Sequence, residues 1–389
     1  MRRWLAAPVA FAVAIGLSSL HVAPVKAQPK GEAPVEESFL TADGVQLKGL
    51  FHATNKDAAT APVAVLLYAP GPDRDMTKGD WAGLAGRLNE AGYHVFRFDW
   101  RGHGKSTEIK DPKKFWNNPF LNGGNVNYNG YIKGGPPKKP LKNDLYYKDL
   151  SPTRAERYLP AYLNDLAAVR LHLDSKNDNK TLNTSSIYLI GTGDAAALGL
   201  GWIATEWSRP AVFPKEGQLG VGVPGYEFVP QQLVGQFPPE GGHDIAGAVW
   251  ISPNRPALIS EAATKKWIST YAPKIRENNP MLFLYADKDA AGKKQSEFFY
   301  NEVLVGDPRR AKAFNLAPIS DTFIKEVKGG STLNGVKLLD NNAELKVQDT
   351  IIQFMAAIQK ERAKLPSKNR NYSTPYFINA QSFGFAATP

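Results

Sequence analysis

The chain has 389 residues and no cysteine, which excludes disulfide bonds, thiolate nucleophiles and thiolate metal ligands. Its apolar content of 43% is ordinary for a soluble globular protein, and its length suits one large α/β domain. The formal charge is +10, and we interpret it as a solvated surface because no predicted helix carries a dense basic stripe. Nucleic acid is therefore not an expected partner.

The first 27 residues have the pattern of a secretory signal peptide. Arg2 and Arg3 precede the apolar run WLAAPVAFAVAIGL, which is short for a membrane span, and the segment from Val25 to Ala27 offers small residues for cleavage. The sequence therefore predicts an exported bacterial protein, periplasmic or secreted, with an uncleaved N-terminal anchor as the alternative. Loss of the signal removes three basic residues and lowers the charge to +7. No later run approaches the length of a membrane span.

Beyond a flexible leader at 28–37, the chain alternates strand and helix patterns. Residues 38–53 hold two β-like runs around Asp43-Gly44, which is a strong hairpin signal. The apolar run at 61–70 suits a strand that is buried on both faces. Further strands are predicted at 93–99, 186–191, 246–253, 281–287 and 322–328, and helices at 80–92, 159–173, from 194, and at 347–358.

Two irregular stretches, at about 107–150 and 207–245, are interpreted as insertions into one domain at 38–363. The first is rich in Asn, Gly, Pro and Lys with interleaved aromatic residues, which suits either a lid that binds sugars or peptides or a long loop pinned to the surface. A polar tail follows at 364–389. The alternation predicts an α/β protein with a mostly parallel central sheet and helices on both faces, and in such sheets ligands bind at the carboxyl ends of the strands.

One segment resembles a known family. GYHVFRFDWRGHGKS is similar to the segment after the fourth strand of α/β-hydrolases, where the turn D-x-R-G-x-G-x-S is common, and the matching residues are Asp99, Arg101, Gly102, His103, Gly104 and Ser106. Pro70-Gly71 stands where the family often has His-Gly at its oxyanion loop, and LYADKD resembles the strand that delivers its acid. The resemblance runs in family order over about residues 38–360 and implies the α/β-hydrolase fold.

The resemblance also implies a catalytic triad, and two of its three members are missing. A nucleophile is expected at the centre of G-x-S-x-G, an acid after the penultimate strand, and a histidine after the last strand. The equivalent positions hold Gly193, Asp289 and Thr332. Glycine cannot act as a nucleophile, and the last histidine in the chain is His243, so none follows Asp289. Without that partner, we interpret Asp289 as a residue that fixes the turn after its strand.

Asp194 keeps a catalytic alternative open. An aspartate at the elbow of this fold can form an ester intermediate, although its release needs a water activated by histidine. His243 would be a displaced base if the second insertion folds over the strand ends. The other interpretation is that Asp194 caps the following helix. The oxyanion-loop equivalents that the resemblance implies are Gly71, Pro72 and Asp194.

No cofactor or metal is predicted. The six histidines are scattered without ligand spacing. GTGDAAALG matches part of the dinucleotide pattern G-x-G-x-x-G, but no acidic residue ends a strand about 20 residues later. The sequence therefore favours a non-catalytic hydrolase-like protein, a pseudoenzyme that binds a small molecule, peptide or glycan in its cleft. The alternative is an active ester or amide hydrolase with displaced residues such as Asp194.

Overall fold

The computed structural model describes most of the chain. The described residues are 33–57, 59–117, 132–133, 141–150, 158–209, 220–221, 226–227, 232–233, 240–255, 260–305, 324–340, 342–371 and 377–378. The predicted signal peptide lies outside them, as do parts of the predicted leader, of both predicted insertions and of the tail.

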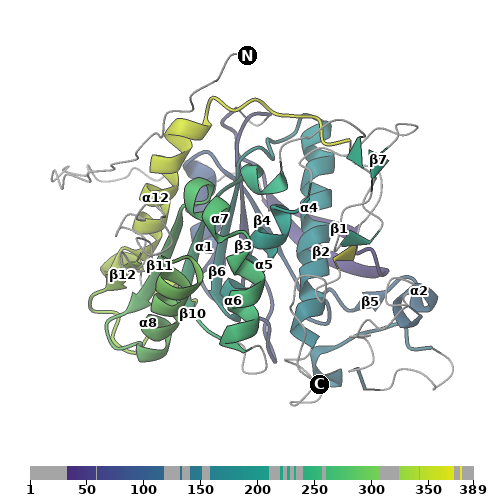
Figure 1. Ribbon diagram of the computed structural model, residues 1–389, viewed down its shortest axis with the longest axis horizontal. Helices are drawn as coiled ribbons and strands as arrows, with labels where there is room; N and C mark the ends of the chain where they lie inside the picture. Colours follow the sequence, from purple (N-terminus) through teal and green to yellow (C-terminus); the bar gives the residue numbers. More distant parts are fainter. Residues whose placement is uncertain are drawn as a thin grey trace.

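One sheet forms the centre of the protein (Figure 1), and its described strands are β1 (Val35–Leu40), β2 (Val45–His52), β3 (Val63–Leu67), β4 (His94–Phe98), β5 (Glu108–Ile109), β6 (Ile187–Gly193), β10 (Ile245–Pro253), β11 (Met281–Ala286) and β12 (Ile324–Val327). The order is β1-β2-β4-β3-β6-β10-β11-β12, with β5 beside β2. Neighbours from β4 to β12 are parallel, whereas β2 is antiparallel to its partners. The predicted mostly parallel sheet is confirmed.

Two small sheets pair β13 (Phe377–Ile378) with β8 (Tyr226–Glu227), and β7 (Gly220–Val221) with β9 (Gln232–Leu233).

Helices cover both faces of the central sheet (Figure 1), and those described are α1 (Trp81–Glu90), α2 (Pro112–Trp116), η3 (Tyr147–Asp149), η4 (Leu159–Tyr162), α4 (Leu163–Asp178), α5 (Asp194–Glu206), η5 (Gly241–Asp244), α6 (Glu261–Ser269), α7 (Ala272–Asn278), α8 (Ala290–Glu297), η6 (Phe298–Val303), α10 (Lys337–Asp340), α11 (Asn342–Leu345) and α12 (Val347–Arg362). None of them is long and apolar enough to cross a lipid bilayer.

The two helix layers follow from the alternation of side chains along each strand. On β10, Trp250 lies so close to α5 that a Cβ atom at Gly199 would be 2.4 Å from its ring. Three residues earlier, a Cβ atom at Gly247 would be 3.0 Å from Ile358 of α12. Helices α5 and α12 therefore lie on opposite faces, with α4 and α6 next to α5, and α1 next to α12.

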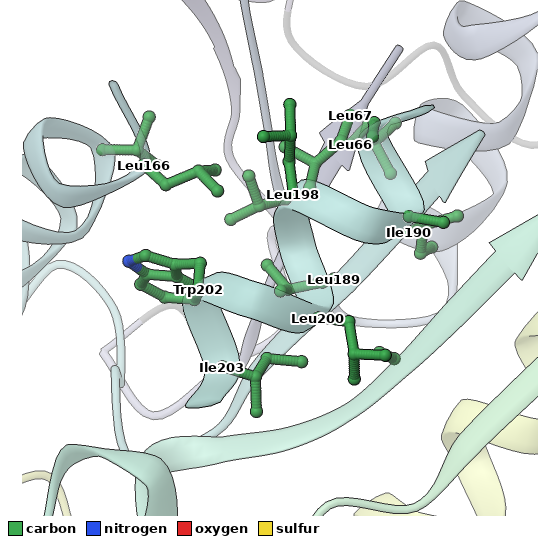
Figure 2. Close-up of a cluster of buried hydrophobic side chains, with 14 of the residues drawn as sticks. Leu66, Leu67, Leu166, Leu189, Ile190, Leu198, Leu200, Trp202 and Ile203 are labelled. Atoms are coloured by element: carbon green, nitrogen blue, oxygen red, sulfur yellow. The ribbon is translucent and has the colours of Figure 1, made fainter. Parts of the chain in front are cut away.

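Helix α5 packs closely against the sheet because small residues face Trp250. A Cβ atom at Gly191, in β6, would lie 2.9 Å from the buried Trp250 ring. Apolar side chains from α5, β3, β6 and α4 complete the contact, and Figure 2 shows several of them, among them Leu66, Leu67, Leu166, Leu189, Ile190, Leu198 and Leu200. This packing holds the start of α5 at the carboxyl end of β6.

The hairpin and the buried strand predicted from the sequence are confirmed. β1 and β2 pair in an antiparallel register that ends with Leu40 opposite Gln46, and Gly44 in the turn has φ +89°. Every residue of β3 is buried. The predicted C-terminal helix is present as α12 and extends four residues further than expected, to Arg362.

The described part of the tail packs onto the amino edge of the sheet, where the parallel strands begin. Ser185 Oγ, just before β6, donates to the Pro366 carbonyl at 2.9 Å. Asn177 Nδ2, in α4, donates to the Lys368 carbonyl at 2.7 Å. The tail is therefore an integral part of the domain over these residues.

Candidate functional site

The turn between β6 and α5 has the geometry of a nucleophile elbow. β6 ends at Gly193, and α5 begins at Asp194. Gly193 has φ +55° and ψ −127°, a conformation that a residue with a side chain adopts only under strain. The G-x-S-x-G motif places its serine on this kind of strained strand-to-helix turn. Because the residue here is a glycine, the central position of the elbow has no nucleophilic side chain.

Three loops enclose the elbow. A Cβ atom at Gly193 would lie 3.1 Å from Ala69 Cβ, in the loop after β3. The Gly193 carbonyl accepts a hydrogen bond from the Asn254 N–H, after β10, at 3.1 Å. A Cβ atom at Gly335, in the loop after β12, would lie 3.7 Å from Thr192 Cβ. The turn therefore lies among the loops at the carboxyl ends of the strands, where open α/β sheets bind ligands.

The strand order and the elbow together decide the fold. An antiparallel pair leads into a parallel sheet, and the strained turn lies at the sheet's centre, on β6 between β3 and β10. The chain has the α/β-hydrolase fold. The fold that the sequence resemblance implied is thereby confirmed, and it places the oxyanion loop of the α/β-hydrolase fold between β3 and α1.

No family model matches the sequence, and no curated protein matches it. Similar solved structures include an esterase from Pyrococcus furiosus, at 14% identity and TM-score 0.40, covering 83% of this chain and 90% of that one. A putative alpha/beta hydrolase from Agrobacterium tumefaciens has 14% identity and TM-score 0.44, and the match covers 86% of this chain and 100% of that one. An alpha-beta serine hydrolase homologue from Coxiella burnetii has 12% identity and TM-score 0.40, covering 85% and 99%. Similarity at this level does not by itself establish the fold, which is assigned from the strand order and the elbow.

The loop between β3 and α1 lacks the oxyanion donors that the resemblance implies. An oxyanion hole in this fold takes one N–H from this loop and one from the residue after the nucleophile, which here is Asp194. Pro72 has no N–H. The Gly71 N–H donates to Nε2 of His103 at 3.0 Å, so it is already used within the protein. Neither loop position therefore offers an N–H to a developing oxyanion.

His103 lies at the same edge of the sheet, and its ring is fully engaged. The side chain is 3% exposed, Nδ1 lies 3.0 Å from the Arg101 carbonyl oxygen, and Nε2 accepts the Gly71 N–H. Burial lowers the pKa of His103 to about 4. The imidazole is therefore neutral at pH 7, with Nδ1 as the donor, and it orders the loop after β3 instead of acting as a base.

The other described histidines lie away from the elbow. His52 ends β2 and His94 begins β4, and both lie at the amino edge because β2 runs antiparallel to β4. His243 directly precedes β10 at this edge, so the displaced-base alternative for His243 is wrong. His172 lies in α4, where its Nε2 is 2.6 Å from a carboxylate oxygen of Glu37.

The D-x-R-G-x-G-x-S turn is built from structural contacts. Asp99 accepts the N–H of Lys105 within the turn at 2.9 Å. The buried Arg101 guanidinium donates to both carboxylate oxygens of Asp43 at 2.6 and 3.0 Å, and to Asp165 at 2.7 Å. It thereby ties the turn to the first hairpin and to α4. The residues that carry the family resemblance thus hold the scaffold together.

Asp289 occupies the acid position and caps a helix. It is the N-cap of α8, and its Oδ1 accepts the Gly292 N–H at 2.9 Å. Its Oδ2 is buried and has no hydrogen-bond partner among the described residues. Thr332, at the histidine position, is exposed in the loop after β12, and the neighbouring Ser331 carbonyl accepts the Lys288 N–H at 3.1 Å. The fold therefore joins the two loops of a triad, but neither supplies a base.

Asp194 is the first residue of α5 and is partly buried. The N-cap position of this helix is Gly193, and Asp194 follows it in the first turn. A carboxylate in the first turn of a helix interacts favourably with the helix dipole, which gives Asp194 an electrostatic role in α5. Across the ranges that the structure describes, no group of three His, Asp or Glu side chains is arranged to hold a metal ion.

Sequence reasoning missed Ser252, which lies beside the elbow. Ile251 pairs with Thr192 and Pro253 pairs with Gly193, so Ser252 is the extra residue of a bulge in β10. It has φ +44°, it is 6% exposed, and its Oγ has no hydrogen-bond partner among the described residues. No sequence signal could identify it, because a serine near the end of an apolar strand does not by itself predict a bulge.

Proposed function

We propose that this chain is an exported, non-catalytic protein that binds a ligand or partner at the carboxyl edge of a hydrolase-type sheet. The observation that carries the proposal is the elbow, which keeps the strained backbone of a nucleophile turn at Gly193 but has no side chain there. Acyl transfer by this fold starts with attack by the residue at that position. A glycine at the elbow removes the first step.

The rest of the machinery supports the same conclusion. A triad needs a base as well as a nucleophile, and the sequence has no histidine after Asp289. His103 is the one described histidine at the carboxyl edge, and both of its ring nitrogens are engaged. The oxyanion loop has a proline at position 72 and an N–H at Gly71 that is already bonded. Activation, attack and oxyanion stabilisation each lack a component.

The catalytic test is an activity assay on the mature protein. A fluorophosphonate probe and short-chain p-nitrophenyl esters are expected to give no labelling and no turnover above the buffer rate, with an active serine esterase as the positive control. Asp194→Asn distinguishes the two functions, because the alternative hydrolase uses Asp194 as its nucleophile. Robust turnover that disappears in Asp194→Asn would establish the alternative and sink the non-catalytic proposal.

Export is tested separately in a bacterial host. The pattern at Val25 to Ala27 predicts cleavage before Gln28. N-terminal sequencing of the protein from the periplasm or the medium should therefore begin at Gln28. Recovery of the intact chain from the membrane fraction would support the uncleaved anchor instead.

A further inference from the structure

The loop after β3 is attached to the rest of the domain through the ring of His103. The buried Gly71 N–H donates to Nε2 of this ring at 3.0 Å, and Nδ1 lies 3.0 Å from the Arg101 carbonyl oxygen. Among the described residues, no other hydrogen bond joins residues 69–75 to a segment beyond 68–78. The polar attachment of this loop therefore depends on which nitrogens of His103 carry a proton.

Both ends of the loop are fixed independently of His103. At the first end, the Tyr68 carbonyl accepts a hydrogen bond from Nε1 of Trp100 at 2.8 Å. At the second end, the Met76 N–H donates to Oδ1 of Asp99 at 2.8 Å. Loss of the histidine bond therefore frees a short segment that stays tethered on both sides.

Protonation reverses the role of the ring nitrogen that faces the loop. In the neutral imidazole Nδ1 is the donor and Nε2 the acceptor, whereas the imidazolium carries an N–H on both nitrogens. Nε2–H would then face the Gly71 N–H, and two donors cannot bond to each other. The buried amide loses its acceptor, which is unfavourable for a polar group that is shielded from water. The positive ring would also be repelled by Arg74, whose charge acts on His103 from within the loop.

The ionisable residues around the ring come from several segments: Tyr68 and Arg74 from the loop after β3, Asp99 and Arg101 from its own turn, Tyr147 from η3 and Tyr162 from η4. Burial raises the pKa of Tyr68 and of Tyr162 well above the ordinary value, so neither ionises in acid. The Arg101 guanidinium is paired with Asp43 and Asp165. Burial raises the pKa of Asp99 above 3.8, so Asp99 is the competing acid-titrating group that an experiment must separate from His103.

We propose that protonation of His103 releases residues 69–75 from the D-x-R-G-x-G-x-S turn, so that the loop beside the elbow becomes mobile in acid. A Cβ atom at Gly193 would lie 3.1 Å from Ala69 Cβ, so the release changes the surroundings of the elbow itself. Burial, and then the charge of Arg74, lower the pKa of His103 to about 4, which sets the transition near pH 4. The inference goes beyond the proposed function and holds whether or not this edge binds a ligand.

The Gly71 amide can be followed directly by NMR. The sequence has two Pro-Gly pairs, at 70–71 and 224–225, so carbonyl-13C proline with 15N glycine leaves two signals in an HNCO spectrum of the mature protein, and Pro224→Ala removes one of them. As the pH falls, the Gly71 signal should shift in one step with a midpoint near pH 4, together with the Cε1–H signal of His103. The order parameter of the Gly71 amide should fall from about 0.85 to below about 0.6.

His103→Gln tests the assignment, because glutamine does not titrate and its amide oxygen can accept the Gly71 N–H. This variant should lose the step and keep a high order parameter in acid. His52→Gln is the matched control, because His52 also has a pKa of about 4 but ends β2 at the amino edge. The Gly71 step should remain in that variant.

Each contrary outcome overturns the inference. A Gly71 step that persists in His103→Gln assigns the transition to another group, with Asp99 the first to test. No step, or an order parameter that stays high, contradicts release of the loop. Loss of the far-UV circular dichroism signal at the same pH shows global unfolding instead of a local switch. If His103→Gln is unfolded, the wild type decides, because Gly71 and His103 must then share one midpoint. Ester turnover would sink the proposed function and leave this result unchanged.

Discussion

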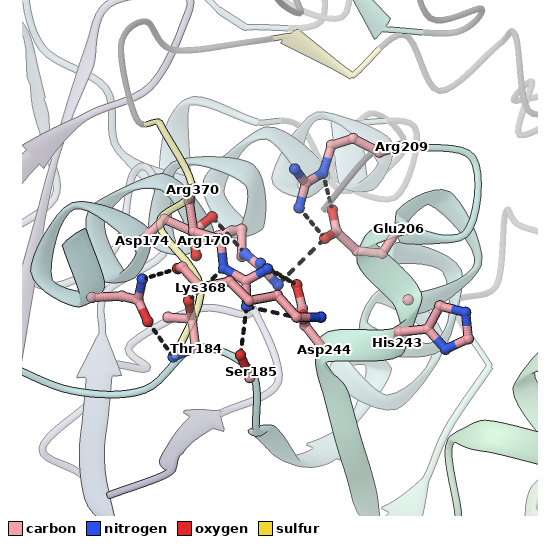
Figure 3. A network of polar contacts seen from close by, with 12 residues as sticks. Arg170, Asp174, Thr184, Ser185, Glu206, Arg209, His243, Asp244, Lys368 and Arg370 are labelled. Carbon is pink, nitrogen blue, oxygen red and sulfur yellow. Dashed lines mark hydrogen bonds and ion pairs between the residues drawn. The ribbon is translucent and has the colours of Figure 1, made fainter. Parts of the chain in front are cut away.

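The two edges of the central sheet differ in the kind of buried polar contact that they hold. At the amino edge, the buried Arg170, Arg209 and Arg370 pair with the buried carboxylates of Asp174, Glu206 and Asp244, as Figure 3 shows. Two atoms of this network, Arg170 Nη1 and Asp174 Oδ1, have no hydrogen-bond partner among the described residues. At the carboxyl edge, the buried and neutral His103 accepts the N–H of Gly71 and orders the loop after β3.

Asp244 links the parts of the amino-edge network. Its Oδ2 accepts from Arg170 at 2.8 Å, and its Oδ1 accepts from Arg370 at 3.0 Å. Burial raises the pKa of Asp244, but the charges of Arg170 and Arg370 outweigh burial and hold this pKa below its ordinary value. The network connects the C-terminal segment to α4 and β10, so we interpret it as structural.

The difference separates two structural roles. The amino-edge network joins segments that are distant in the sequence, whereas His103 orders a single loop beside the elbow. Substitutions in the network should therefore lower the free energy of unfolding most, and a substitution at His103 should change how stability depends on pH. The following experiments test that division.

The largest effect is expected from Asp244→Ala, which leaves Arg170 and Arg370 buried without their shared partner. Removing one side of a buried ion pair costs about 3–5 kcal/mol of unfolding free energy, measured by urea denaturation. Glu240→Ala is the control, because its exposed ion pair with Lys274 should be worth about 1 kcal/mol or less. Equal losses in the two variants would show that the network is not a structural core.

The pH dependence of stability should distinguish His103 from the amino-edge network. The pKa of His103 is lowered from 6.5 to about 4 by burial, so the unfolded chain binds a proton in this range that the folded chain does not. Stability should fall as the pH drops from about 6.5 to about 4, by about 3 kcal/mol for this group. His103→Gln should reduce the slope of the unfolding free energy across that window, although His52, also with a pKa near 4, retains part of it. An unchanged slope contradicts a buried neutral His103.

The amino-edge network of arginines and carboxylates should respond only at lower pH. Because the pKa of Asp244 lies below its ordinary value of 3.8, its stabilising contribution is complete above that value and is lost as the pH falls through the lowered pKa. Asp244→Asn should therefore flatten the stability profile below about pH 4 and leave the window of His103 unaltered. A changed slope at pH 5 to 6 in this variant would place Asp244 outside the paired network.

Rebuilding the triad should not restore hydrolysis. Gly193→Ser combined with Thr332→His supplies a nucleophile and a base, but Pro72 and the bonded Gly71 N–H leave the oxyanion loop without its donor. We expect no p-nitrophenyl acetate turnover above the buffer rate and a stability loss of about 1–3 kcal/mol from the positive φ at Gly193. Turnover in the double variant would show that a third donor serves the site.

The smallest effect is expected from Ser252→Gly. Relief of the strained φ should raise the unfolding free energy by about 1 kcal/mol, and Ser331→Gly should give a similar gain. An unfolding free energy of Ser252→Gly equal to that of the wild type would show that the φ of Ser252 carries no strain.

Much of the fold could be predicted from local sequence patterns. The hairpin at Asp43-Gly44, the buried strand β3 and the helix α12 all follow from turn residues and hydrophobic periodicity, which act within a few positions. The elbow could also be placed, because Gly191 and Gly193 mark a small-residue turn between a strand and a helix. The lack of a histidine after Asp289 could be read directly from the positions of the six histidines.

By itself, the sequence determined the order of the elements, the glycine at position 193 and the lack of a histidine after Asp289, because these depend on which residues occur and at what spacing. The tertiary structure alone decided which polar groups are paired. Arg370 reaches Asp244 across 126 positions, His103 takes the N–H of Gly71, and Ser252 is displaced by a bulge. Such pairings arise when strands and loops pack in three dimensions, and no local propensity encodes them.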